Sequence, residues 1–279
     1  MNLAMDIDNL RLRFKTALLI LPIFFIPIYL GGVYFKIALI CVSTLFFYEL
    51  VTIINNAERK VATTLYLCFL CLSLFILKIA PDVAFGICLA ALVVGSILIK
   101  LVYRVNFWFQ AIIGYSYLSF LVFYQIRLQG NPTDGLISIF LVILIAVISD
   151  SFGYFGGQLF GRKKIFPYIS PNKTLEGTLF AFFTPAIFIF FLALIFEVDF
   201  NNSIIYIFIS IMALGAILGD LIGSYFKRNF NVKNSSNLLP GHGGLLDRMD
   251  SIVGVGIFFI ILDQITRNNS YENILYFWR

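Results

Sequence analysis

Acidic, basic and glycine residues cluster between Asp220 and Asp250, in the last third of the chain. Asp247 and Asp250 are three residues apart at the start of an expected helix, so their carboxylates should share one face. No thiolate or histidine cluster suited to zinc accompanies them. Oxygen-only ligands suit Mg²⁺, which keeps several waters and bridges substrate phosphates. The spacing therefore predicts that the two carboxylates share a divalent metal ion.

The sequence just before that expected helix is suited to binding phosphate. Gly243 and Gly244 allow a ligand to approach the backbone, and the helix N-terminus presents N–H groups and a positive dipole end to a polyphosphate. His242 is the only histidine of the chain; a lone histidine is usually structural, but between glycines it is also a ligand candidate. Further phosphate charge can be neutralised by four basic residues: Lys227, Arg228, Lys233 and Arg248.

A second set of candidates lies earlier in the chain. Asp150 falls in an apolar run, where a carboxylate is costly unless it faces a cavity or a partner. The glycines that follow it suit either ligand approach or simple helix packing, and we favour the functional reading. Ser170 can cap a helix that begins at Pro171, and Lys173 suits a phosphate, although an ordinary cytoplasmic helix start explains these residues equally well.

Two further acids, Glu49 and Asp263, also lie in apolar runs but have no local motif around them. For both we favour an interhelical hydrogen bond or a water-facing position over catalysis. We therefore leave them outside the expected site.

The elements that must position these residues are membrane helices. The chain is 60% hydrophobic and 13% charged, with a mean hydropathy of +0.94. In lipid every backbone N–H and C=O group must be paired within the protein, so spanning segments are either helices or strands of a closed barrel. The apolar runs lack the alternating pattern of barrel strands, and we therefore expect an all-α fold. We expect nine membrane-spanning helices, at about 16–35, 37–54, 61–79, 83–103, 107–126, 136–155, 174–196, 203–225 and 249–266. The fifth of these runs is the least apolar.

The basic residues predict the orientation of these helices. Most of the 20 Lys and Arg residues fall in alternate loops if the N-terminus is cytoplasmic, as the positive-inside rule requires. Topology thus explains the net charge of +5, and we expect no nucleic-acid partner. The first apolar run lacks a cleavage site and should remain as a helix. The four cysteines should be small buried hydrophobic residues without a redox role.

We expect one continuous membrane domain, in which residues 1–135 form helices 1 to 5 and residues 136–279 form helices 6 to 9 with the catalytic site. The chemistry-bearing residues concentrate in the second half. This asymmetry argues against a secondary transporter, which would show broken helices in two matching halves.

The cluster in the second half also resembles the signature of a known family, the phosphatidate cytidylyltransferases or CDP-diacylglycerol synthases. The matching stretch reads Ser224-x-Phe226-Lys227-Arg228-x4-Lys233-Asn234-x-Ser236-x2-Leu239-Pro240-x-His242-Gly243-Gly244-Leu245-x-Asp247-Arg248-Met249-Asp250. The blocks that begin at Asp150 and Ser170 are similar to further parts of the family pattern. Asn234 departs from it, because the family has an acid at this position.

The resemblance implies that phosphatidic acid attacks CTP in a bacterial inner membrane, with the active site on the cytoplasmic side. It further implies Mg²⁺ on Asp220, Asp247 and Asp250, and leaves open a second cation and a homodimer. The phosphates of CTP and the membrane lipid would meet the basic residues named above, with Asp150, Lys173, Ser224, His242, Gly243 and Gly244 as further substrate contacts. The alternatives are a membrane transferase acting on another lipid acid, or a polyprenol kinase.

Overall fold

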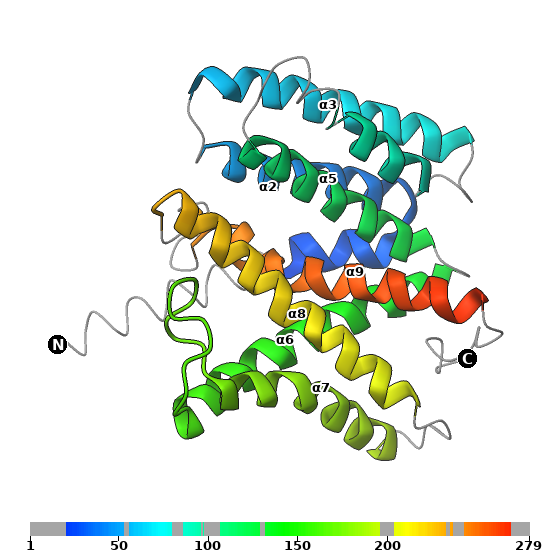
Figure 1. The fold of residues 1–279 in the computed structure, drawn as a ribbon. Helices are drawn as coiled ribbons and strands as arrows, with labels where there is room; N and C mark the ends of the chain where they lie inside the picture. Colours follow the sequence, from blue (N-terminus) through cyan, green and yellow to red (C-terminus); the bar gives the residue numbers. More distant parts are fainter. Residues whose placement is uncertain are drawn as a thin grey trace. The chain divides into compact units, whose positions relative to one another are not determined.

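The computed structural model describes residues 21–52, 56–79, 86–95, 97, 107–128, 132–195, 204–232, 235–236 and 243–268. In these ranges every extended element of secondary structure is a helix, and an isolated β-bridge joins Lys164 and Thr174. The all-α prediction is therefore confirmed (Figure 1).

Seven long helices carry the labels of Figure 1: α2 (Gly32–Thr52), α3 (Asn56–Ile79), α5 (Phe107–Leu128), α6 (Pro132–Phe160), α7 (Leu175–Ile195), α8 (Ile204–Asn229) and α9 (Leu246–Asn268). Two shorter apolar helical segments cover Leu21–Leu30 and Gly86–Gly95. Within the described ranges, five helices are long and apolar enough to cross a membrane, namely α2, α6, α7, α8 and the Leu246–Thr266 part of α9. The protein is thus a polytopic integral membrane protein.

Several predicted boundaries move. The break expected after residue 35 lies at Gly31, which has a φ of 65° and accepts the N–H of Phe35 at 3.1 Å. A left-handed glycine ends one helix and lets the next begin, which the continuous apolar run did not reveal. α6 runs to Phe160, beyond the predicted residue 155, so the glycines that follow Asp150 are helical. The run at 107–126, the least apolar, does form a helix.

The chain divides into two compact units, which we describe separately. Unit 1 comprises Met1–Gln125 and Asn234–Leu246, and unit 2 comprises Ile126–Lys233 and Asp247–Arg279. In unit 1, aromatic side chains pack between the helices: Phe47 stacks on Tyr66 with ring centroids 4.1 Å apart, and Phe69 meets Tyr117 at 5.5 Å. Tyr66 and Tyr117 are fully buried in this core.

In unit 2, α6, α7 and α8 lie side by side (Figure 1). The α6–α7 contact depends on glycine: a Cβ added at Gly177 would lie 2.7 Å from the carbonyl oxygen of Gly153 and 2.9 Å from the Cα of Gly157. The glycines after Asp150 therefore do act in helix packing, the alternative to the functional reading that the sequence favoured. Phe160 and Phe180 stack beside this contact, with ring centroids 5.4 Å apart.

Large apolar side chains are exposed along the helices of both units, as expected for surfaces that face lipid. The cysteines correct one prediction. Cys88 is buried, but Cys41, Cys68 and Cys71 are exposed on these apolar outer surfaces. In lipid an outward-facing thiol needs no polar partner, so burial inside the protein was not required.

Candidate active site

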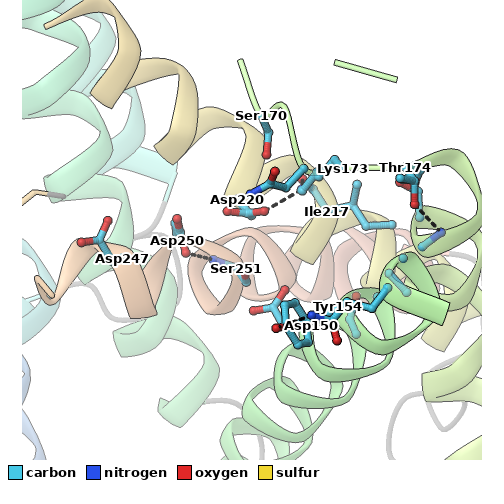
Figure 2. A pocket seen from close by; sticks show the side chains of 18 residues that line it. Asp150, Tyr154, Ser170, Lys173, Thr174, Ile217, Asp220, Asp247, Asp250 and Ser251 are labelled. Carbon is cyan, nitrogen blue, oxygen red and sulfur yellow. Dashed lines mark hydrogen bonds and ion pairs between the residues drawn. The ribbon is translucent and has the colours of Figure 1, made fainter. Parts of the chain in front are cut away.

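Unit 2 contains a pocket of about 620 Å³ that combines carboxylates with a lysine (Figure 2). Its lining comes from the end of α6, the loop before α7, the start of α7, the second half of α8 and the start of α9. The polar lining residues are Ser149, Asp150, Tyr154, Gln158, Ser170, Asn172, Lys173, Thr174, Thr178, Asp220, Asp247, Asp250 and Ser251. Five of the predicted site residues therefore line one pocket: Asp150, Lys173, Asp220, Asp247 and Asp250.

Close contact between α8 and α9 brings Asp220 and Asp250 together. A Cβ at Gly219 would lie 2.2 Å from the carbonyl oxygen of Asp250, and a Cβ at Gly254 would lie 2.0 Å from that of Gly215. Gly223 lies directly against the Asp250 side chain. Small residues at these positions let the two backbones touch, so acids from different helices can share one pocket.

The loop before α7 positions Lys173. The N–H of Leu175 donates to the carbonyl of Lys163 at 2.8 Å, and the N–H of Ile165 donates to the carbonyl of Lys173 at 3.2 Å. The Glu176 carboxylate accepts the N–H of Arg162 at 2.9 Å. These bonds fold residues 161–174 back on themselves and fix the base of the loop.

The predicted cap of this helix was wrong. α7 begins at Leu175, and its cap is Thr174, whose hydroxyl accepts the N–H of Gly177 at 3.2 Å. Ser170 and Pro171 belong to the preceding turn, where the N–H of Lys173 donates to the carbonyl of Ser170 at 3.1 Å. Both Ser170 and Thr174 are hydroxyl residues that can cap, and only the folded loop distinguishes them.

Lys173 makes the central ion pair of the pocket. Its Nζ lies 2.6 Å from Asp220 Oδ2 and also donates to the carbonyl of Ile217 at 3.3 Å. Both side chains of the pair remain partly exposed to the pocket. Asp250, by contrast, is 3% exposed, and its Oδ1 accepts the N–H of Ser251 at 2.9 Å.

Asp247 has a different environment from the other predicted metal ligands. Its Oδ1 lies 2.6 Å from the Nζ of Lys227, and both side chains of this pair are largely buried. Across the described ranges, no three His, Cys, Asp or Glu side chains gather closely enough to hold a metal ion by themselves. Asp220, Asp247 and Asp250 thus do not form a ready three-carboxylate cluster, and metal binding by them stays a prediction.

The remaining predicted site residues lie elsewhere. Ser224 is half-buried on α8, and neither it nor Lys227, Arg228 or Arg248 lines the pocket. Arg228 is exposed and donates to the carbonyl of Ile169 at 3.4 Å, in the loop before α7. Gly243 and Gly244 belong to unit 1, where Gly243 has a φ of 87°. Lys233, Asn234 and His242 lie outside the described residues.

Residues 11–266 match the sequence pattern of the Cytidylyltransferase family. The chain belongs to this family. The match covers most of the 279 residues, including all of the pocket lining. The resemblance seen in the signature stretch is therefore confirmed at the level of the family.

This cytidylyltransferase-family chain is also similar to bacterial proteins named phosphatidate cytidylyltransferase. The protein of Staphylococcus aureus strain COL is 40% identical over 146 residues, which are 51% of this chain and 53% of the relative. That of Staphylococcus haemolyticus strain JCSC1435 is 39% identical over 149 residues, with the same coverage. That of Staphylococcus saprophyticus is 38% identical over 160 residues, 55% of this chain and 57% of the relative. The chain spans about half the length of the curated relatives it matches.

Sequence reasoning missed several polar residues that line the pocket. Tyr154 and Gln158 lie one turn apart on α6, and the Gln158 amide donates to the Tyr154 hydroxyl at 2.7 Å. Ser251 follows Asp250, and Thr178 lies one turn beyond the Thr174 cap. The signal that could have identified Tyr154 and Gln158 is helical spacing, because residues four and eight positions after Asp150 share its face.

The charges of the pocket show what it can bind. Four carboxylates line it, and among the described residues Lys173 is its one cationic lining residue. Such a surface repels a polyphosphate unless cations accompany the ligand. Carboxylate oxygens on α6, α8 and α9 are the donor type that Mg²⁺ prefers, and two of them with water and phosphate oxygens can complete its shell. The residues present therefore fit Mg²⁺ bound together with phosphate oxygens.

Proposed function

We propose that this protein is a phosphatidate cytidylyltransferase, which converts CTP and phosphatidic acid to CDP-diacylglycerol and pyrophosphate. The observation that carries the proposal is the carboxylate pocket, in which Lys173 and the acids of three helices meet in a membrane protein of the cytidylyltransferase family. The Staphylococcus relatives, which are named phosphatidate cytidylyltransferase, support the same activity.

The proposed reaction is a substitution at the α-phosphorus of CTP. A phosphate oxygen of phosphatidic acid forms a bond to this phosphorus, and the bond from it to the bridging oxygen of pyrophosphate breaks. The attacking oxygen is already anionic, so no side chain has to remove a proton. The protein has to bring two anions together and stabilise the charge that accumulates between them.

The chain supplies two kinds of group for this task. Asp220 and Asp250, with Asp150 opposite them, would hold Mg²⁺, which when bound neutralises phosphate oxygens and stabilises the leaving pyrophosphate. A second cation, if one binds, would meet the same oxygen donors. Lys173 has three N–H donors, and Asp220 and Ile217 account for two of them. The third donor can bind a phosphate oxygen while Asp220 keeps the ammonium group in position.

The lipid substrate and the charge distribution suggest where the reaction occurs. We place the site at the cytoplasmic face of a bacterial inner membrane, because most loop Lys and Arg residues fall on that side in the expected topology. If successive helices alternate in direction, the expected topology places the ends of α6 and α8 and the starts of α7 and α9 on the same side of the membrane. The pocket is lined by the second halves of α6 and α8 and by the first turns of α7 and α9.

The test is to follow each phosphate of CTP. Purified protein in detergent is incubated with phosphatidic acid, Mg²⁺ and CTP labelled at either the α or the γ phosphorus. Cytidylyl transfer moves the α label into lipid and releases the γ label as pyrophosphate. Transfer of the γ label to a lipid would instead indicate a kinase. If neither label is transferred to lipid while an active relative assayed in parallel does transfer label, the proposal is refuted.

A further inference from the structure

Glu49 is a buried acid that the proposed reaction does not use. It lies near the end of α2, is 1% exposed, and belongs to unit 1. Four donors surround its carboxylate. Oε1 accepts the N–H of Leu245 at 2.8 Å and the hydroxyl of Ser236 at 2.5 Å, whereas Oε2 accepts the N–H of Leu246 at 2.9 Å and the hydroxyl of Ser235 at 3.1 Å.

These donors come from both sides of residues 237–244, the glycine-rich segment. Ser235 and Ser236 precede it, and Leu245 and Leu246 follow it. Packing within the cluster is tight: a Cβ at Gly244 would lie 1.8 Å from the Ser235 hydroxyl oxygen and 2.8 Å from Glu49 Oε2. One carboxylate thus joins two stretches of chain that are separated by residues 237–244.

The same carboxylate caps the next helix from outside it. Leu246 is the first residue of α9, and its N–H would otherwise be one of the unpaired donors of a helix start. A negative charge is also favourable at this end of a helix dipole. Asp247, which lines the pocket, follows Leu246 directly in the chain.

We propose that Glu49 is a positioning residue for cytidylyl transfer: it clamps the base of the glycine-rich segment and the first turn of α9. This inference rests on the proposed function, because its kinetic part concerns that reaction. Burying a carboxylate is costly, and an apolar side chain would fill the space without that cost. A carboxylate at this position is explained if it fixes the geometry of the four donors, because an apolar side chain cannot accept their hydrogen bonds.

The informative substitution is Glu49→Gln, which keeps the size of the side chain. The amide NH2 replaces one acceptor, so the backbone N–H that this oxygen accepted loses its bond to residue 49, whereas the serine hydroxyl can rotate to accept from the NH2 group. We expect faster hydrogen–deuterium exchange in peptides covering residues 243–252, and turnover about 10–100-fold lower, the usual cost of losing a group that orients a site. The loss should appear in kcat/KM for CTP, with the KM for phosphatidic acid unchanged.

The matched control is Thr44→Val on the same helix. The Thr44 hydroxyl donates to the carbonyl of Ile40 within α2, so its removal leaves the clamp intact. Wild-type exchange and turnover are expected. Combining Glu49→Gln with Ser236→Ala should cost less than the sum of the two separate effects, because both remove the same interaction.

Two results would overturn the inference. One is a hydrogen–deuterium exchange rate in Glu49→Gln that equals the rate in Thr44→Val. The other is faster exchange in Glu49→Gln together with a turnover equal to that of Thr44→Val. If Glu49→Gln does not fold, Ser235→Ala with Ser236→Ala replaces it, and unchanged exchange or turnover in that variant is equally contradictory. If the wild type itself fails to transfer cytidylyl groups, the proposed function fails, whereas the exchange comparison still decides whether Glu49 holds the segment.

Discussion

At the scale of single residues, Asp250 is a buried carboxylate among other charged groups of the pocket. It is almost completely buried beside Asp220, at the contact between two glycine-lined helices. Two neighbouring carboxylates repel each other, and a bound cation relieves this repulsion. Their proximity is therefore a reason to expect a metal ion.

Asp250→Asn should weaken Mg²⁺ binding in particular. The amide removes one full charge and leaves only a dipole, so the Mg²⁺ concentration for half-maximal rate should rise at least about tenfold, equivalent to about 1.4 kcal/mol. The measurement is a Mg²⁺ titration of turnover at saturating CTP. Asp263→Asn, which alters a buried acid of α9 outside the pocket lining, is the control. Superimposable curves for wild type and Asp250→Asn would remove Asp250 from the metal site.

The Lys227–Asp247 pair supports a second prediction. Each side chain is mostly buried, so either single change, Lys227→Met or Asp247→Asn, breaks an ion pair at a position largely shielded from water. We expect both single variants to melt at lower temperature than wild type in detergent. The double variant should recover part of the loss, with a coupling energy of about 0.5–3 kcal/mol. Strict additivity of the two effects would mean that the pair contributes nothing to stability.

The sequence predicted acids that the structure brings together in one pocket, but it did not predict all of their partners. Asp150 and Asp220 were predictable because lipid makes isolated carboxylates costly, Asp250 because of its spacing from Asp247, and Lys173 because it lies at a helix start. The role of Glu49 was not, since its four donors lie almost 200 residues further along the chain. The Lys227–Asp247 bond is likewise a contact between two helices, which residue spacing within one helix does not predict.

At the scale of elements, the α8–α9 contact determines the site. Gly219→Ala would place a methyl group 2.2 Å from the carbonyl oxygen of Asp250, so one backbone has to move. We expect a loss of about 1–3 kcal/mol of stability from this overpacking, with a marked loss of turnover. Thermal unfolding and a turnover assay measure the two effects.

The control for that substitution is Gly114→Ala on α5. A Cβ at Gly114 meets nothing within 4 Å, and alanine is the better helix former. Gly114→Ala should therefore be at least as stable as wild type. Equal behaviour of the two alanine variants would show that α8 and α9 do not need their close contact.

Helix existence was predictable, whereas helix ends were not. Long apolar runs predicted α6, α7, α8 and α9, because only helices satisfy the backbone in lipid. Hydropathy does not detect a left-handed glycine such as Gly31 or choose between two capping hydroxyls such as Ser170 and Thr174. Those choices depend on local backbone conformation and on hydrogen bonds to neighbouring segments.

At the scale of the whole molecule, the expected topology can be tested by chemical labelling. In a variant without the four native cysteines, single cysteines at Lys60 and Lys164 should react with a membrane-impermeant thiol reagent only from the cytoplasmic side. A cysteine at Lys36 should react only from the other side. All three positions are exposed, so access by the reagent depends on the membrane. Labelling of Lys164→Cys from outside would reverse the assigned orientation of the pocket.

The most direct test of the central claim measures transfer of α-labelled CMP from CTP to phosphatidic acid by wild type and by Asp220→Asn. Asp220 contributes a carboxylate to the pocket and holds Lys173 in place, so its amide variant loses both functions. We predict labelled CDP-diacylglycerol from wild type and at least about 100-fold slower formation by the variant, equivalent to about 2.7 kcal/mol. Similar rates for the two folded proteins would contradict the assignment of this pocket as the site of cytidylyl transfer.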